Sequence, residues 1–175
     1  MGHSGRTIKI MRSMLLSFAI VFLIDTVPGV MGLGQANESF EEQIEHFGKK
    51  YTDQVPEHYP MEKAIKNGDI TPVNITGSQR QKIDQFVDHV KNKQADFIRF
   101  VRYSPTNDPV ITEFQFNGEL IYYRFDSTRD KSGLLDKGAK VGKHIKMQTD
   151  YCKKLVSNKE KLYLTECYKN GKITF

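Results

Sequence analysis

The sequence predicts an α+β fold in which one long helix packs on one face of an antiparallel sheet. Three patterns support this prediction. They are an apolar stripe at helical spacing within residues 83–90, alternating strands on both sides of Asn117 and Gly118, and two cysteines that fall opposite each other in a hairpin near the end of the chain. The sheet is expected to consist of an edge strand, a three-stranded meander and a C-terminal hairpin closed by a disulfide.

The first 36 residues have the pattern of a signal peptide. Basic residues precede an apolar run at residues 14–24, which is shorter than the roughly 20 residues that a membrane-spanning helix needs. Small residues at Gly34 and Ala36 favour cleavage after Ala36. We therefore expect a secreted or extracellular protein. The alternative is a protein that stays tethered to a membrane because the apolar segment is not cleaved.

The remaining chain is expected to contain a polar arm followed by one domain. Residues 37–60 are polar and contain two prolines, which predicts a tether or arm. Within this segment, the helical spacing of Ile44 and Phe47 allows a short helix. Residues 61–175 then form a single α+β domain, because a chain of this length supports one hydrophobic core.

The first half of that domain is predicted to contain a helical turn, an edge strand and the long helix. The turn occupies residues 61–69, and the strand occupies residues 70–76. Pro72 places this strand at an edge, because proline has no amide proton to donate. Ser78 and Gln81 match a capping box that would begin the long helix. The apolar residues that follow at helical spacing are Ile83, Phe86, Val87 and Val90.

The predicted meander comprises three strands between residues 96 and 125. Asn117 and Gly118 separate the second strand from the third, and both tolerate the positive φ of a two-residue type I′ turn. Folding the hairpin about this turn pairs Phe114 with Ile121. The resulting hairpin has one apolar face and one mixed face, as expected for a sheet that is covered on one side.

Cys152 and Cys167 are the only cysteines in the chain. If residues 158–161 form a loop, pairing outward from it places the two cysteines opposite each other, next to the opposite-charge pair of Lys153 and Glu166. This register predicts a disulfide, which exported proteins retain. Closing a loop of about 15 residues contributes roughly 3 kcal/mol to stability. Neither a C-x-x-C motif nor a histidine cluster supports a redox or metal role.

Sequence motifs of common enzymes and metal sites do not occur in the chain. It has no H-E-x-x-H, no G-x-S-x-G, no phosphate-binding glycine loop and no dinucleotide fingerprint. We therefore expect neither a metal nor a cofactor, and we predict a non-enzymatic protein. The alternative is a small secreted hydrolase whose site is assembled from dispersed residues.

Positive charge is concentrated in one segment. After residue 36 the chain has 23 Lys+Arg and 20 Asp+Glu, and this surplus of three is too small to predict nucleic-acid binding. Residues 129–154 hold eight basic and three acidic residues, and they form a long glycine-containing connection of the kind that is often functional. We predict that this basic loop of a monomer binds an anionic cell-wall polymer, a membrane surface or an acidic protein. The alternative is a solvated loop without a partner. The candidate binding residues are Arg129, Lys131, Lys137, Lys140, Lys143 and Lys146.

Three features together resemble a known family: "AIKNGDI" before the first strand, "DSTRDKSG" after the central hairpin, and the terminal cysteine pair. The chain resembles the domain of unknown function 4362 family, a group of small exported domains from Gram-positive spore-forming bacteria. The resemblance covers about residues 61–168. It implies no activity and no catalytic residues. Similar members often carry a lipidated cysteine after the signal segment, but no cysteine precedes Cys152 here.

The "DSTRDKSG" segment is expected to be structural. Asp126 and Ser127 suit the start of a turn, and Gly133 allows a sharp bend. Arg129 lies between Asp126 and Asp130 and is expected to form ion pairs that fix the exit of the loop from the sheet. A ligand site at this segment is the alternative.

Overall fold

The computed structural model describes residues 38–51, 55–72, 75–157 and 162–174. They belong to one compact unit, Asn37–Phe175, which contains its own buried core. The predicted signal peptide at residues 1–36 lies outside the described residues. Among the residues that are described, no helix has the length and apolar composition needed to cross a membrane.

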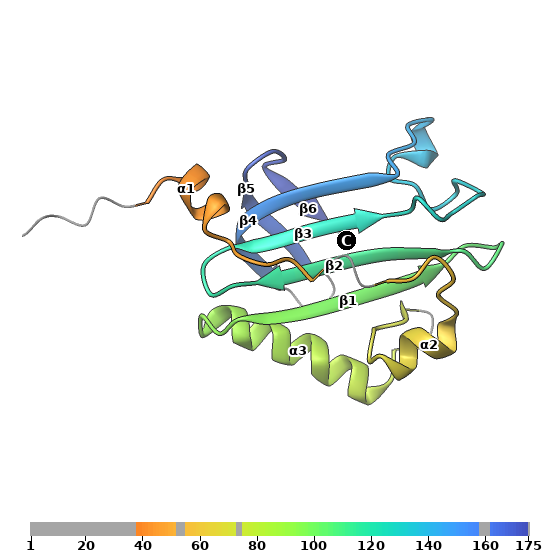
Figure 1. Ribbon diagram of the computed structural model, residues 1–175, viewed down its shortest axis with the longest axis horizontal. Helices are drawn as coiled ribbons and strands as arrows, with labels where there is room; N and C mark the ends of the chain where they lie inside the picture. The colour runs from red at the N-terminus through yellow and green to blue at the C-terminus, as the bar shows by residue number, and fades with distance from the viewer. Residues whose placement is uncertain (1–37, 52–54, 73–74, 158–161, 175) are drawn as a thin grey trace, which may run out of the picture. The chain divides into compact units, whose positions relative to one another are not determined.

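The architecture is α+β, with six strands in one antiparallel sheet (Figure 1). Each strand pairs with the next one along the chain, so the predicted meander and the C-terminal hairpin form one continuous sheet. The strands are β1 (Asp96–Tyr103), β2 (Pro109–Phe116), β3 (Ile121–Asp126), β4 (Met147–Ser157), β5 (Leu162–Cys167) and β6 (Lys172–Thr174). The helices are α1 (Phe40–Glu45), α2 (Met61–Lys66), α3 (Gly77–Lys91) and the 3₁₀ helix η3 (Ala139–Val141).

The long predicted helix is α3, but it begins earlier than expected. Its capping box is formed by Thr76 and Gln79, not by Ser78 and Gln81. The Thr76 hydroxyl accepts a hydrogen bond from the Gln79 amide, and the Gln79 side chain accepts one from the Thr76 amide. Thr76–Gln79 and Ser78–Gln81 both match the capping-box pattern, and the helix begins at Thr76–Gln79, the pair that comes first in the sequence. Ser78 therefore lies inside the first turn. Of the predicted apolar stripe, Ile83, Phe86 and Val87 are buried and Val90 is partly buried.

The β2–β3 hairpin is present, but its predicted register is wrong by two residues. Phe114 pairs with Tyr123 and not with Ile121. The connection has four residues, 117–120, because the Asn117 side chain accepts hydrogen bonds from two backbone amides within it. A shift by an even number of residues leaves each side chain on its original face. The predicted apolar face is therefore retained.

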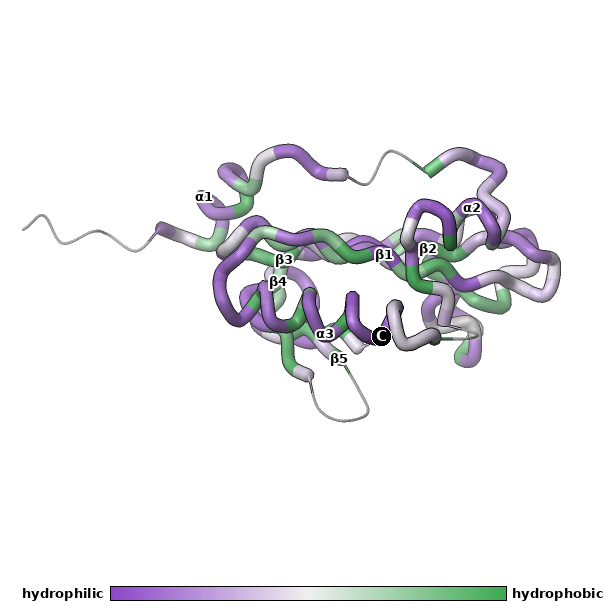
Figure 2. The backbone as a smooth tube through the Cα atoms, turned by 90° about the horizontal axis from the view of Figure 1, so that it is seen from below, coloured by the Kyte–Doolittle hydropathy of each residue, from purple (hydrophilic) through white to green (hydrophobic). Residues whose placement is uncertain are grey.

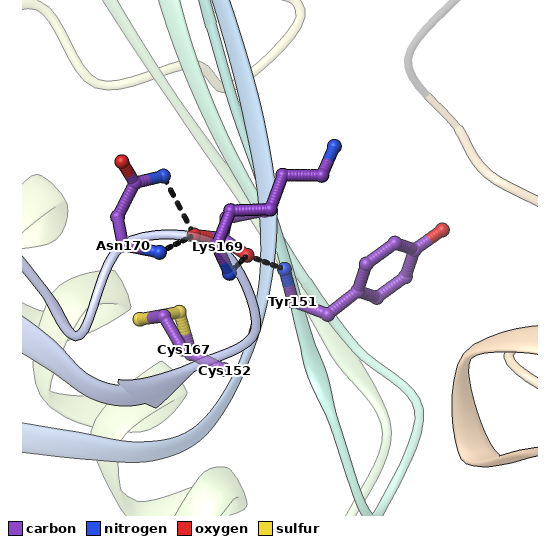
Figure 3. The surroundings of a disulfide bond; sticks show 6 residues. Tyr151, Cys152, Cys167, Lys169 and Asn170 are labelled. Atoms are coloured by element: carbon purple, nitrogen blue, oxygen red, sulfur yellow. Dashed lines mark hydrogen bonds between the residues drawn. A yellow bond between two sulfur atoms is a disulfide. The ribbon is translucent and has the colours of Figure 1, made fainter. Parts of the chain in front are cut away.

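The C-terminal hairpin has the predicted register, with Cys152 opposite Cys167 and a disulfide between them. Buried Asp150 lies beside this bond and accepts hydrogen bonds from the backbone amides of Lys169 and Asn170, each at 3.0 Å. Figure 3 shows Lys169 and Asn170 next to the two cysteines. These contacts hold the turn that leads into β6, a strand that the sequence patterns did not predict.

The two faces of the sheet are covered by different parts of the chain (Figure 2). On one face, Phe86 of α3 contacts Phe114, with ring centres 6.4 Å apart. Because strand side chains alternate, Gln115 lies on the opposite face. There it exchanges hydrogen bonds with the backbone of Lys49 and Tyr51, which belong to the segment 37–60 that was predicted to be a tether or arm. Phe47 and Tyr59 of this segment are buried, so these parts of it pack against the folded domain.

The edge strand predicted at residues 70–76 is reduced to a single parallel bridge between Ile70 and Phe100. The Ile70 amide donates to Arg99, and the Val101 amide donates to Ile70, both at 2.8 Å. Proline two residues later cannot donate to a continuing ladder, which agrees with the short pairing. Residues 73–74 lie outside the described residues.

Candidate functional site

A pocket of about 800 Å³ lies between α3, the sheet and the β3–β4 loop (residues 127–146). Phe100, Thr112 and Phe125 are cross-strand neighbours in three adjacent strands, so their side chains form a row along the floor of the pocket. Ile83 of α3 lines one wall, and Leu135 of the loop lines another. The volume falls within the range of about 300–1,000 Å³ that is usual for small-molecule sites.

Charged side chains of both signs line this largely apolar pocket. The loop contributes two lysines, and α3 and β1 each contribute an arginine, so four cations face two carboxylates. The six charged residues are Arg80, Asp84, Arg102, Asp136, Lys137 and Lys140. The lining therefore carries a positive surplus of two, which favours an anionic ligand over a cationic one.

Lys137 is the cation most closely enclosed by the pocket. Its ammonium lies 4.8 Å from the centre of the Tyr123 ring and 5.4 Å from that of Phe125. A bridge between Lys137 and Ile145, with backbone hydrogen bonds of 3.2 and 3.1 Å, fixes the backbone from which this side chain extends. Burial, and after it the charge of Arg102, lowers the pKa of Lys137 to about 8.

The hydroxyl of Tyr123 is buried and has no hydrogen-bond partner within the described part of the chain. Burial raises the pKa of Tyr123 well above its ordinary value, so the phenol keeps its proton at neutral pH. A buried polar group without a partner costs about 1–3 kcal/mol. Tyr123 borders the pocket, but its side chain exposes no surface, so the hydroxyl is closed to a ligand in this structure.

The β3–β4 loop is held by hydrogen bonds within itself. Asp130 is buried and accepts hydrogen bonds from Ser132, through both its amide (2.9 Å) and its hydroxyl (2.6 Å), and from the Leu135 amide (3.1 Å). Burial opposes ionisation of Asp130, but these hydrogen bonds outweigh it and lower the pKa. Lys146 donates to the Asp130 carbonyl at 3.0 Å. The loop that presents Lys137 is therefore internally braced.

Arg129 holds the start of the loop against the sheet, as expected for a structural "DSTRDKSG" segment. Its guanidinium lies 3.3 Å from the Asp126 carboxylate, which confirms one of the two predicted ion pairs. The other side of the guanidinium donates to the Val55 carbonyl at 3.1 Å and lies 3.5 Å from Glu57. Asp130 binds the loop's own amides and hydroxyl as described above.

The six candidate binding residues do not gather on one surface. Lys137 and Lys140 line the pocket, whereas Arg129 and Lys146 make the structural contacts described above. Lys131 and Lys143 are exposed and do not line it.

The segment at residues 129–154 is also shorter as a loop than expected, because β4 begins at Met147. Lys153 and Lys154 consequently lie in a strand, where Lys154 pairs with Glu166.

Sequence patterns missed Arg80, Arg102 and Tyr123 as possible ligand contacts. Each lies on a regular element that is distant in sequence from the basic loop. One signal was available for Arg102, because it shares the strand face of Ile98 and Phe100 and so interrupts an apolar row. Arg102 lies near Lys137 because of how the loop folds, and the sequence pattern does not indicate this proximity.

Ser127, Asp136 and His144 meet at the base of the loop and resemble the composition of a catalytic triad. The Ser127 hydroxyl donates to Asp136 at 2.6 Å, and His144 contacts the other carboxylate oxygen at 3.2 Å. In a catalytic triad the histidine lies between the other two residues and takes the serine proton. Here the carboxylate lies between them and Ser127 is buried, so the arrangement supports the loop and does not place His144 to take the Ser127 proton.

A row of alternating charges occupies the sheet face opposite α3. Arg99 lies 2.7 Å from Glu113 and 3.6 Å from Asp69. Arg124 lies 3.6 Å from Glu113 and 3.0 Å from Asp126. Burial is the largest influence on Glu113 and Asp69, and it raises the pKa of both carboxyl groups. Through Arg99 this row connects the sheet to Asp69. Arg129 in turn connects the start of the loop to Val55 and Glu57.

Among the residues that the structure describes, no group of three or more His, Cys, Asp or Glu side chains is placed to hold a metal ion.

One family matches the chain, and its description is Domain of unknown function (DUF4362). The match covers residues 67–163, which is more than half of the 175 residues. Comparison with curated proteins and with solved structures gives no match. The matched region contains α3, the first four strands, the β3–β4 loop and all the pocket residues named above. The chain therefore belongs to the DUF4362 family, whose function is not known.

Proposed function

We propose that this protein is an exported, non-enzymatic binding domain whose pocket holds a small amphipathic anion. The observation that carries the proposal is the position of Lys137, whose ammonium lies over the rings of Tyr123 and Phe125 at the pocket. The ligand is anionic, as expected for a partner of the basic loop. It would bind in the pocket that part of this loop lines, and not on the outer surface of the loop.

The lining suits both ends of such a ligand. The aromatic and aliphatic side chains of the floor and walls would cover an apolar body, a contact worth about 25 cal/mol per Å² of apolar surface buried. The anionic end would reach Lys137, with Arg102 close enough to influence the Lys137 charge. An anion placed there would offset the cost of holding an ammonium away from water.

Export is supported by the cysteine pair. A disulfide persists in oxidising compartments and is rare in the cytosol, so the bond between Cys152 and Cys167 favours a location outside it. The signal-peptide pattern at residues 1–36 points the same way. Retention at the cell envelope through an uncleaved leader is part of this proposal.

Titration of residues 37–175 with anilinonaphthalene sulfonate, a fluorescent amphipathic anion, tests the proposal. We expect saturable binding to one site. Lys137→Met should weaken it about tenfold or more, because a hydrogen bond to a charged group contributes about 1.5–3 kcal/mol. Lys143→Met is the matched control, since Lys143 lies in the same loop, is exposed and does not line the pocket. Equal affinities of the wild type and Lys137→Met would contradict the proposal.

A further inference from the structure

We infer that the mouth of this pocket docks on the surface of an anionic lipid bilayer. The inference goes beyond the proposed function, because docking concerns exposed side chains around the pocket and does not require a ligand inside it. It would place the pocket where amphipathic anions are present.

The first supporting observation is a group of exposed apolar side chains at the mouth. Ile75, Leu134 and Val141 all line the pocket, and their exposed fractions are 43%, 64% and 81%. They come from two segments far apart in sequence, the residues before α3 and the β3–β4 loop. Grouped exposed apolar side chains on a soluble domain mark an interaction surface, whereas isolated ones do not.

The second observation is the charge around these apolar side chains. Arg80, Arg102 and Lys140 are exposed residues that line the same pocket, and Asp84 is the exposed carboxylate among the lining residues. The mouth therefore has a positive surplus of two. Apolar side chains ringed by basic ones match a bilayer interface, where the former enter the acyl boundary and the latter meet lipid phosphates.

The charge also argues against a second copy of this chain as the occupant. A symmetric pair formed through this mouth would bring two identical, net-positive rims together, which is unfavourable. An anionic bilayer offers the complementary charge over the whole mouth. It also accepts apolar side chains without requiring a shaped partner surface.

Sedimentation of residues 37–175 with lipid vesicles tests the inference. We expect binding to phosphatidylglycerol vesicles and little binding to phosphatidylcholine vesicles. The double variant Leu134→Ser, Val141→Ser should weaken binding at least tenfold, because both side chains would enter the acyl boundary. Ile65→Ser is the matched control, since Ile65 is 52% exposed on α2 and does not line the pocket.

A fluorescent reporter provides a second, independent measurement. The chain contains no tryptophan, so Val141→Trp and Ile65→Trp each introduce a single probe. The emission of Val141→Trp should shift to shorter wavelength with phosphatidylglycerol vesicles, and that of Ile65→Trp should not. The inference is overturned if neither probe shifts, if both shift equally, or if the double variant binds as well as the wild type. It is also overturned if Leu134 and Val141 support a concentration-dependent dimer in place of vesicle binding. Loss of dye binding with intact vesicle binding would refute the proposed function alone.

Discussion

The ammonium of Lys137 lies 4.8 Å from the centre of the Tyr123 ring, and the hydroxyl of that ring is buried without a hydrogen-bond partner among the described residues. One residue comes from a loop and the other from the middle of the sheet. Their contact holds a cation against an aromatic ring at the pocket.

Binding of an anionic probe in the pocket should weaken as the pH rises through about 8, because burial and the charge of Arg102 lower the pKa of Lys137 to about 8. The protonated ammonium attracts the anion, and the neutral amine formed above this pH does not. A fluorescence titration repeated between pH 6.5 and 9.5 measures the effect. Lys137→Arg should remove the pH dependence, since a guanidinium stays protonated throughout this range. A wild-type affinity that does not change with pH would refute the assignment.

Tyr123→Phe should stabilise the protein or leave its stability unchanged, because it removes a buried hydroxyl that has no partner. The expected gain in the free energy of unfolding is about 1 kcal/mol. The same change should leave binding of the anionic probe unchanged, since the hydroxyl exposes no surface to the pocket. Urea denaturation and dye titration on the same preparation separate the two effects. A loss of stability would indicate that the hydroxyl has a partner in solution.

Replacing Cys152 and Cys167 together by alanine should lower the free energy of unfolding by about 3 kcal/mol, because the disulfide closes a loop of 15 residues. Urea denaturation measures the loss. Reductant should destabilise the wild type by a similar amount and should have no effect on the double variant. If the two proteins unfold at the same urea concentration, the bond does not stabilise the fold.

Glu113→Ala should destabilise the protein by about 3 kcal/mol or more, because it removes a buried carboxylate that lies between Arg99 and Arg124. The matched control is Glu166→Ala, which breaks the exposed pair with Lys154 and should cost at most about 1 kcal/mol. Thermal unfolding of the two variants gives the comparison. Similar losses would show that the charge row contributes no more than a surface ion pair.

Local sequence patterns predicted a feature correctly where only one cap or register matched the residues. They predicted it wrongly where two caps or two registers matched. The α3 stripe and the register of Cys152 opposite Cys167 were correct, because each depends on residues close in sequence. The α3 cap and the β2–β3 register were wrong. In both, an alternative local hydrogen-bond pattern was available, through Thr76 and through the Asn117 side chain respectively.

The sequence alone determined the fold class, the family resemblance, the disulfide and the concentration of positive charge in residues 129–154. Tertiary contacts place Lys137 and Lys140 at a pocket with Arg80 and Arg102, while Arg129 and Lys146 support the loop. The physical reason is that hydrophobic periodicity and turn chemistry act over a few residues. The direction of a long side chain depends on carbonyls, carboxylates and rings that folding brings together from distant strands.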